Sequence, residues 1–276
     1  MLFSSRSRTY AHALKEAYSG RKTVAPQAAS LGLTPETSVQ TLHELHTMFI
    51  AEGMNPVGRK LIADSMGSDL DLADQACLGY LYRAQFADDE GELAPIRTHG
   101  STRLRLEPKL ILRFAQTPDL SDSFETFIDA IDAIAMGAEL QLLPYADASW
   151  RFEDKICANG FNKTLLSGEL KTLSLSSKKH FSQLLDLSTF SFSRTSASGS
   201  LLVDYTPGYK TALSSIGDLY RLLQRYDDSP TGAAIQAGDL LALNAVCPAQ
   251  PVAAGEEWVC VSTGFDLDSL RIRFTN

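Results

Sequence analysis

Apolar residues at helical spacing dominate the first third of the chain. The clearest helix begins at Thr34-Pro35-Glu36, where a threonine N-cap, a proline in the first turn and an early acid all suit a helix start. Apolar side chains then recur every three or four residues, at Val39, Leu42, Leu45, Phe49 and Ile50. Gly53 closes this pattern, so we predict an amphipathic helix that ends there.

The rest of the chain has mostly strand patterns, with two further helices expected at 121–135 and 210–224. Short runs rich in apolar and β-branched residues predict strands at 103–107, 110–114, 140–143, 190–193, 201–205, 240–243, 257–261 and 270–274. The serine-rich run 173–200 is expected to be flexible, although Phe190 and Phe192 alternate with serine as in a half-buried strand.

This order of elements predicts an α+β fold. We expect a small α-rich N-terminal segment, residues 1–80, packed on a β-rich body, residues 81–276.

Composition narrows the class of protein. The 276 residues are 44% hydrophobic and contain no uninterrupted apolar run of the roughly 20 residues that a membrane span needs. The net charge is −8 and the basic residues are scattered, which argues against a nucleic-acid partner. The four cysteines form no CxxC pair and the N-terminus has no signal-peptide core, so we expect a reduced, cytoplasmic protein without a membrane or nucleic-acid partner.

Common catalytic motifs are absent from the sequence. It contains no GxGxxG, P-loop, GxSxG or HExxH, which removes the motif support for dinucleotide, nucleotide, serine-hydrolase and zincin chemistry. His43 and His46 have i, i+3 spacing and would make half a metal site. An amphipathic helix edge beside Leu42, Leu45 and Phe49 is the favoured interpretation.

Two acids border apolar strands. Glu107 ends the alternating run RLRLE, and Glu139 precedes the apolar run LQLL. A carboxylate in such a place is solvated, paired or bound to a cation, because burying a bare charge is costly.

Several short segments follow one another much as in the 2-hydroxypentadienoate hydratases and 4-oxalocrotonate decarboxylases, which belong to the fumarylacetoacetate hydrolase superfamily. They are Val57-Gly58-Arg59-Lys60, 78–85, Arg105-Leu106-Glu107-Pro108-Lys109, Ala138-Glu139, Ile156-Cys157-Ala158-Asn159, Gly238-Asp239-Leu240-Leu241 and 248–255. The sequence resembles a divergent member of this group from about residue 35 onward.

The resemblance implies an acidic metal site. In that family magnesium or manganese is held by three carboxylates, two of them in an E-x-E strand motif, and binds a 2-oxo acid whose dienolate it stabilises. Glu107 matches the first acid of E-x-E and Glu139 the separate third acid, so both are candidate metal ligands. Lys60 matches the lysine of the G-x-K segment, where an ammonium would hold the substrate carboxylate or move protons.

This chain departs from the family at the same site. Lys109 stands where the second acid of E-x-E is expected, and two further family acids fall on Ala84 and Ala158, whereas Asp64 replaces a threonine. Two unit charges about 4 Å apart interact by roughly 4 kcal/mol at an effective dielectric of about 20, so an ammonium strongly disfavours a bound cation. We therefore hypothesise that Lys109 occupies the metal position between Glu107 and Glu139.

Two functions remain open. The first is a hydratase- or decarboxylase-like lyase for a small 2-oxo acid or its dienol, with Lys60, Glu107, Lys109 and Glu139 as catalytic groups. Asn159 and Asp64 are the candidate substrate-binding groups in this interpretation. The second is a catalytically inactive relative, in which the salt bridge is structural and the chain serves in binding or assembly. The resemblance also implies a homo-oligomer.

Overall fold

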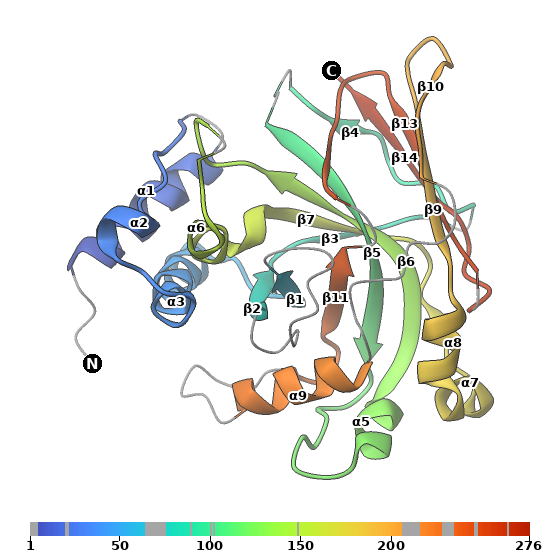
Figure 1. Ribbon diagram of the computed structural model, residues 1–276. Coiled ribbons are helices and arrows are strands. Elements are labelled where there is room, and N and C mark those ends of the chain that lie inside the picture. Colours follow the sequence, from blue (N-terminus) through green and yellow to red (C-terminus); the bar gives the residue numbers. More distant parts are fainter. Residues whose placement is uncertain are drawn as a thin grey trace.

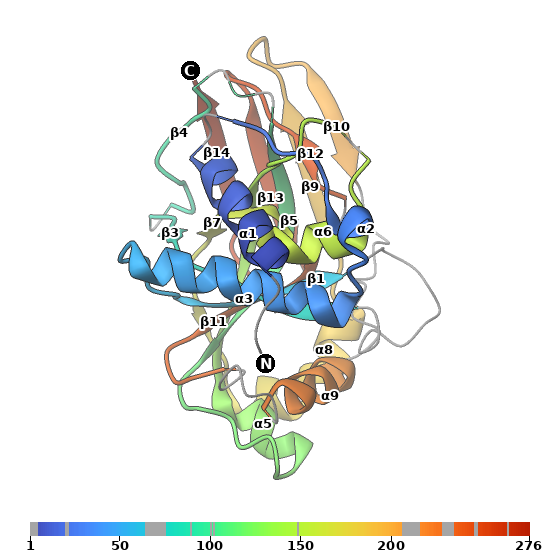
Figure 2. The ribbon, with the colours of Figure 1, turned by 90° about the vertical axis from the view of Figure 1, so that its left-hand side faces the viewer.

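The computed structural model describes residues 5–19, 22–63, 76–88, 90–99, 101, 103–147, 149–205, 216–227, 235–245, 248–263 and 265–276. Three helices open the chain: α1 (Ser5–Tyr18), α2 (Ala28–Leu31) and α3 (Pro35–Ala51). In α3 the Thr34 side chain accepts a hydrogen bond from the Thr37 backbone, and Leu42, Leu45 and Phe49 are buried, which confirms the predicted helix. Figure 2 shows α1 and α3 side by side on one flank of the molecule, where they contact each other.

A strongly curled nine-stranded sheet forms the centre of the described structure (Figure 1). Its main path runs β2 (Ala76–Leu81), β1 (Gly58–Ala63), β11 (Leu240–Ala245), β5 (Leu104–Phe114), β6 (Ile131–Leu142), β7 (Asn162–Ser167) and β3 (Ala84–Phe86). Two short strands complete it, β12 (Gln250–Pro251) on β5 and β8 (Lys171–Thr172) on β6. Because β1 and all of β2 except its last residue, Leu81, lie within residues 1–80, this sheet includes strands from both of the expected segments. The boundary at residue 80 stays a proposal.

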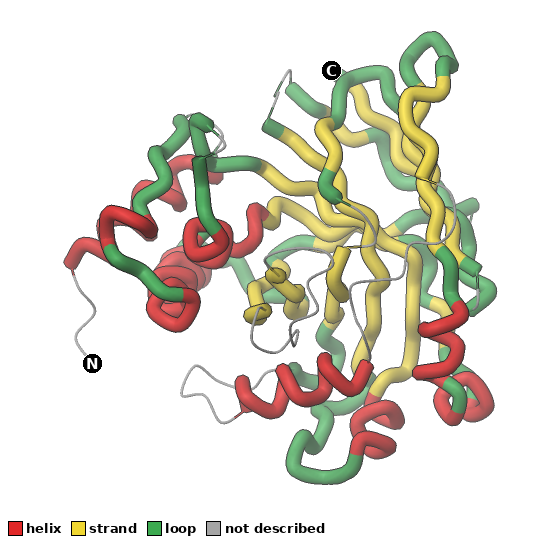
Figure 3. Tube along the Cα trace, viewed as in Figure 1, coloured by secondary structure: helices red, strands yellow, loops and turns green. Residues whose placement is uncertain are grey.

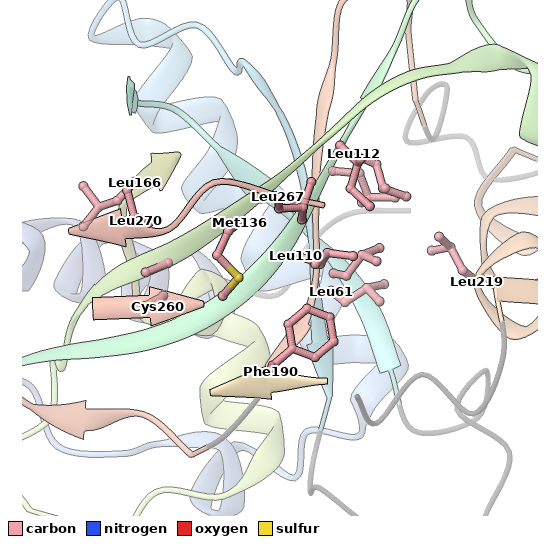
Figure 4. Packing of buried hydrophobic residues seen from close by; sticks show 14 of the residues in the cluster. Leu61, Leu110, Leu112, Met136, Leu166, Phe190, Leu219, Cys260, Leu267 and Leu270 are labelled. Atoms are coloured by element: carbon pink, nitrogen blue, oxygen red, sulfur yellow. The ribbon is translucent and has the colours of Figure 1, made fainter. Parts of the chain in front are cut away.

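A second sheet of five strands packs beside the first. Its order is β10 (Leu201–Tyr205), β9 (Phe190–Thr195), β13 (Glu257–Ser262), β14 (Leu270–Thr275) and β4 (Ile96–Arg97). Met136 of β6, Cys260 of β13 and Leu270 of β14 are at most 1% exposed and belong to one core cluster (Figure 4). The two sheets therefore share a hydrophobic core, and the α+β fold class is confirmed.

The remaining helices lie around the strands (Figure 3). They are α5 (Phe124–Ala130), α6 (Phe152–Cys157), the 3-10 helix η1 (Asn159–Phe161), α7 (Leu175–Lys179), α8 (Phe181–Leu187) and α9 (Ile216–Asp227). No helix in the described ranges is long and apolar enough to cross a bilayer. The first six residues of the helix expected at 210–224 lie outside the described residues.

Two predicted elements are corrected by the structure. The helix expected over 121–135 ends at Ala130, and Ile131 and Ile134 are fully buried in strand β6 instead. The run 173–200, expected to be flexible, contains α7, α8 and β9, and Phe190 and Phe192 are buried on the inner face of β9. In both cases burial of apolar side chains against the sheets outweighs the local preference of the sequence.

The expected strands at 103–107 and 110–114 form one continuous strand, β5, with Pro108 in its interior. On one side β5 pairs with β6 throughout, and Pro108 lies opposite Ala138. On the other side β5 pairs with β11 from Lys109 onward and with β12 at Arg105 and Leu106. Pro108 has no N–H to donate, and it lies between the part of β5 that pairs with β12 and the part that pairs with β11.

Candidate functional site

Four charged side chains meet inside the curled sheet. They are Lys60 on β1, Glu107 and Lys109 on β5, and Glu139 on β6, and we call them the charge cluster. Glu107 and Glu139 are direct cross-strand partners, and Lys109 follows Glu107 by two residues on the same strand face. All four are buried, with exposed fractions of 2%, 9%, 1% and 0% in chain order. Burial of this kind requires that the charges compensate one another.

Lys109 lies between the two carboxylates. Its Nζ is 2.7 Å from Glu107 Oε2 and 3.4 Å from Glu139 Oε2. Glu139 Oε2 has no hydrogen-bond partner among the described residues, so the longer of these contacts is an ion pair without good hydrogen-bond geometry. The two acids and the lysine that the sequence singled out are therefore adjacent in space.

Lys60 reaches the cluster across the curl. In the sheet order β11 and β5 separate its strand from β6, yet its Nζ pairs with Glu139 Oε1 and donates to the Gly160 carbonyl at 3.0 Å. Gly160 has a φ of +56°, and a Cβ at this position would lie 2.8 Å from Lys60 Nζ. A glycine is thus required both by the backbone conformation and by the close approach of the ammonium.

Two amides complete the cluster and were missed at the sequence level. Gln141 Nε2 donates to Glu107 Oε2 at 2.9 Å, and Asn162 Nδ2 donates to Glu139 Oε1 at 3.1 Å. Gln141 follows Glu139 by two residues on β6. Because side chains alternate between the two faces of a strand, the sequence could have placed Gln141 on the same face as Glu139. Asn162 is at the start of β7, and its position near Glu139 depends on the pairing of β6 with β7, which the sequence does not reveal.

Of the two candidate substrate-binding residues, Asn159 and Asp64, the structure describes Asn159. Asn159 is 1% exposed and lies beside Gly160, but both ends of its amide bind the Tyr80 backbone: Oδ1 accepts from Tyr80 N and Nδ2 donates to Tyr80 O, each at 2.8 Å. Its side chain therefore holds β2 in place, and a contact with substrate stays a prediction. Asp64 lies outside the described residues.

Burial and pairing shift the pKa values in the cluster. Burial lowers the pKa of Lys60 to about 8, although the neighbouring Glu139 carboxylate opposes this effect. Burial also acts on Lys109, but Glu107 and Glu139 outweigh it and raise the pKa of this ammonium. Burial disfavours the charged form of Glu107, yet Lys109 outweighs it and lowers the pKa of this carboxyl. Lys109 is thus a permanent cation, whereas Lys60 is the group that can exchange a proton near neutral pH.

The donor set does not fit a magnesium or manganese ion held by three carboxylates. Both acids of the cluster already pair with ammonium groups, and Lys109 Nζ lies between them. In the described part of the chain, no three His, Cys, Asp or Glu side chains gather as a metal site. A divalent cation at this place would face two ammonium charges at short range and gain only two carboxylates.

His43 and His46 belong to a different environment. The His46 ring stacks on Tyr80 with centroids 3.8 Å apart, and its Nδ1 lies 2.8 Å from the Tyr82 hydroxyl. His46 is thus a packing residue between α3 and β2, more enclosed than the helix edge that the sequence predicted. Burial, together with the positive potential of His43 and Arg59, lowers the pKa of His46 to about 4.

Comparison with known proteins identifies the fold. No family model matches the sequence, and no curated relative does. A structure of 4-oxalocrotonate decarboxylase from Pseudomonas putida G7 with magnesium and adipate is similar to this chain, with a TM-score of 0.74 over 99% of both chains at 18% identity. The same enzyme with calcium and acetate gives 0.72 over 99% of both chains at 15% identity.

A yeast fumarylacetoacetate hydrolase family protein gives a TM-score of 0.50 at 12% identity, covering 79% of this chain and 92% of its own. At such identities the likeness establishes the fold. The predicted fumarylacetoacetate-hydrolase-like architecture is therefore confirmed.

Proposed function

We propose that this protein is a metal-independent lyase for a small 2-oxo acid or its dienol, in which the Lys109 ammonium supplies the positive charge of the divalent cation that the resemblance implies. One observation supports this most directly: Lys109 Nζ lies 2.7 Å from Glu107 and 3.4 Å from Glu139, between the two acids that match metal ligands. The reaction type, hydration or decarboxylation, is part of the proposal.

Charge balance supports the same conclusion. In the family site three carboxylates and one lysine accompany a divalent cation, so the charges cancel. In this chain the two acids and two lysines of the charge cluster also cancel. Exchanging an acid for a lysine adds the same two units of charge that the cation supplies. An anionic substrate would therefore meet a site of unchanged total charge.

Each group of the cluster has a role in this proposal. An ammonium has three N–H donors, and each of the two lysines has two contacts within the described residues. Lys60 donates to Glu139 and to the Gly160 carbonyl, and Lys109 pairs closely with Glu107 and, as a longer ion pair, with Glu139. The third N–H of Lys109 would stabilise an enolate oxygen and that of Lys60 a substrate carboxylate. Glu107 or Glu139 would carry a proton between substrate carbons, with Lys60 as its exchange partner because its pKa is lowered to about 8.

The direct test is turnover without metal. Purified protein would be incubated with 2-hydroxy-2,4-pentadienoate or its 2-oxo tautomer, in EDTA and in manganese, while the dienol absorbance is followed. We expect turnover that EDTA does not lower, and a loss of about 100-fold or more in Lys109→Met, since a buried charge that stabilises an oxyanion contributes on this scale. Lys179→Met, at an exposed position of α7, is the matched control. Turnover that depends on manganese would overturn the proposal.

A second candidate is a non-catalytic relative that serves in binding or assembly. It is favoured by the mutual neutralisation of the four charges, which leaves no charge in the cluster without a protein partner. The same assay separates the two: no turnover of either tautomer or of other acyl-pyruvates, with or without manganese, supports this second function.

A further inference from the structure

All three residues of η1 have a left-handed backbone. Asn159, Gly160 and Phe161 have φ angles of +49°, +56° and +67°. Residues with a Cβ rarely adopt such angles, because the Cβ crowds the following carbonyl, so Asn159 and Phe161 make this turn costly. A strained segment of this kind persists only when its surroundings hold it, and such segments gather at functional sites.

Contacts on both sides hold the left-handed turn. The Asn159 amide is bonded at both ends to the Tyr80 backbone of β2. The Phe161 ring makes edge-to-face contacts with Trp150 and Tyr145, with ring centroids 5.0 and 5.9 Å apart. Both Asn159 and Phe161 are at most 2% exposed. These contacts compensate for the unfavourable backbone conformation.

Tyr18, the last residue of α1, contacts the backbone at the start of this turn. Its hydroxyl donates a hydrogen bond to the Ala158 carbonyl, which also accepts one from the Phe161 backbone N–H at 2.8 Å. The Tyr18 ring packs edge-to-face on Phe49 of α3, with centroids 5.7 Å apart. Burial, and then the negative charge of Glu139, raise the pKa of Tyr18, so its hydroxyl keeps its proton and remains a donor.

The turn presents one backbone group to the charge cluster. The Gly160 carbonyl accepts a hydrogen bond from Lys60 Nζ at 3.0 Å, and the same ammonium pairs with Glu139. These two contacts fix the direction of the remaining N–H, which the proposed function assigns to a substrate carboxylate. Because Lys60 is only 2% exposed, solvent does not readily replace a lost acceptor. The place of the Gly160 carbonyl therefore decides how Lys60 faces a substrate.

We propose that Tyr18 is a positioning residue of this site: through the Ala158 carbonyl, its hydroxyl holds the left-handed turn so that Gly160 orients the Lys60 ammonium. Tyr18 acts through the backbone, since no hydrogen bond joins it to the four charged groups within the described residues. The kinetic part of the proposal rests on the proposed lyase function. The structural part, a contact between Gly160 and Lys60 that depends on Tyr18, does not.

A double-mutant cycle tests the kinetic part. Turnover of 2-hydroxy-2,4-pentadienoate in EDTA would be measured for the wild type, Tyr18→Phe, Lys60→Met and the double variant. We expect Tyr18→Phe to lower kcat about tenfold, since a misplaced catalytic group costs on this scale. In the Lys60→Met background the same change should cost less than about twofold, because residues that act through one another are not additive. Equal losses in both backgrounds, or no loss in Tyr18→Phe, overturn the proposal.

Tyr220→Phe is the matched control. It also removes a tyrosine hydroxyl that donates to a backbone carbonyl, that of Asp122 at 2.5 Å, but on α9. We expect this variant to keep the kcat of the wild type. A loss in Tyr220→Phe as large as that in Tyr18→Phe would overturn the proposal, because loss of any such bond would then have the same effect.

Crystal structures of the wild type and Tyr18→Phe test the structural part without substrate. We expect the variant to lose the hydrogen bond between Lys60 Nζ and the Gly160 carbonyl, with these atoms more than about 3.5 Å apart. If the wild type turns over neither tautomer, the lyase proposal fails and this comparison alone decides on Tyr18. A variant that keeps this hydrogen bond, or a wild type in which Tyr18 does not contact the Ala158 carbonyl, overturns the proposal.

Discussion

At the scale of single residues, the proposed function rests on one lysine. Lys109 lies in a cluster whose four charges come from three strands. The amides of Gln141 and Asn162 donate hydrogen bonds to the two carboxylates of this cluster. The sequence predicted the contact of Lys109 with these carboxylates because Glu107 and Lys109 share a strand face and Glu139 was expected to share their site. It did not predict the two amides, whose positions follow from strand register.

Restoring the acid should restore metal binding. Lys109→Glu provides a third carboxylate and removes the competing ammonium, so we expect it to bind manganese at least tenfold more tightly than the wild type does. Isothermal titration calorimetry would measure both affinities. Lys179→Glu makes the same charge change at an exposed site and should behave like the wild type. Equal affinities for wild type and Lys109→Glu would contradict this view of the cluster.

Removing the lysine alone should destabilise the fold. In Lys109→Met the Glu107 carboxylate stays buried without its ion-pair partner and keeps the Gln141 amide as a hydrogen-bond donor. We therefore expect a loss of about 3–5 kcal/mol in the free energy of unfolding. The double variant Glu107→Gln/Lys109→Met removes the stranded charge and should recover part of that loss. Urea unfolding of the wild type, both single variants and the double variant forms a double-mutant cycle. A double variant less stable than Lys109→Met would show that an unpaired Glu107 charge is not the cause of the destabilisation.

At the scale of elements, α3 packs on β2 through an aromatic stack. His46 lies on the Tyr80 ring and contacts the Tyr82 hydroxyl, and its pKa is lowered to about 4 by burial first and then by nearby positive groups. A histidine whose folded pKa is depressed is neutral in the native state. Its contribution to stability is therefore complete above its unfolded pKa of about 6.5 and is lost as the pH falls toward 4.

The pH dependence of stability should report this stack. Between pH 6.5 and 4.5 the wild type is expected to lose about 1–2 kcal/mol more than His46→Phe does, an estimate reduced for the partial exposure of the ring. His12→Gln, at an exposed position of α1, controls for loss of a histidine and should follow the wild type. Urea unfolding at each pH gives the comparison. Parallel curves for wild type and His46→Phe would show that the ring does not titrate as described.

The same scale shows where prediction from sequence fails. The capping residues of α3 are local, and that helix was predicted correctly. The run 121–135 has apolar residues at helical spacing, but its second half is rich in isoleucine and is buried between strands. Tertiary packing therefore favours the strand β6 over a longer helix. Gly137, just beyond that run, lies within β6, where a Cβ would be 2.1 Å from Ile111 Cδ1. Such packing reasons are invisible in a single sequence.

At the scale of the whole molecule, the curl of the sheet makes the site. Lys60 and Glu139 are 79 residues apart in the chain and are separated by two strands in the sheet, and only the curvature brings them into contact. The resemblance in segment order anticipated this arrangement, whereas periodicity alone gave only the fold class. The neighbours in fold include an enzyme crystallised with magnesium, and this chain differs from the implied metal site at Lys109.

Assembly is a further expectation at this scale. The resemblance implies a homo-oligomer, and β10, at the edge of the five-stranded sheet, exposes Leu201 and Leu202 at 59% and 49%. Exposed edge strands with apolar side chains favour pairing with another chain. We expect light scattering to give a multiple of the chain mass, reduced by Leu201→Glu/Leu202→Glu but not by Leu175→Glu on α7. A wild type with the mass of one chain would exclude this assembly.

The position of Lys109 can be tested most directly by anomalous diffraction from crystals grown with manganese. We predict no manganese peak between Glu107 and Glu139, and electron density for the Lys109 ammonium in contact with both carboxylates. A manganese ion bound by these two acids, with Lys109 turned away, would contradict the account.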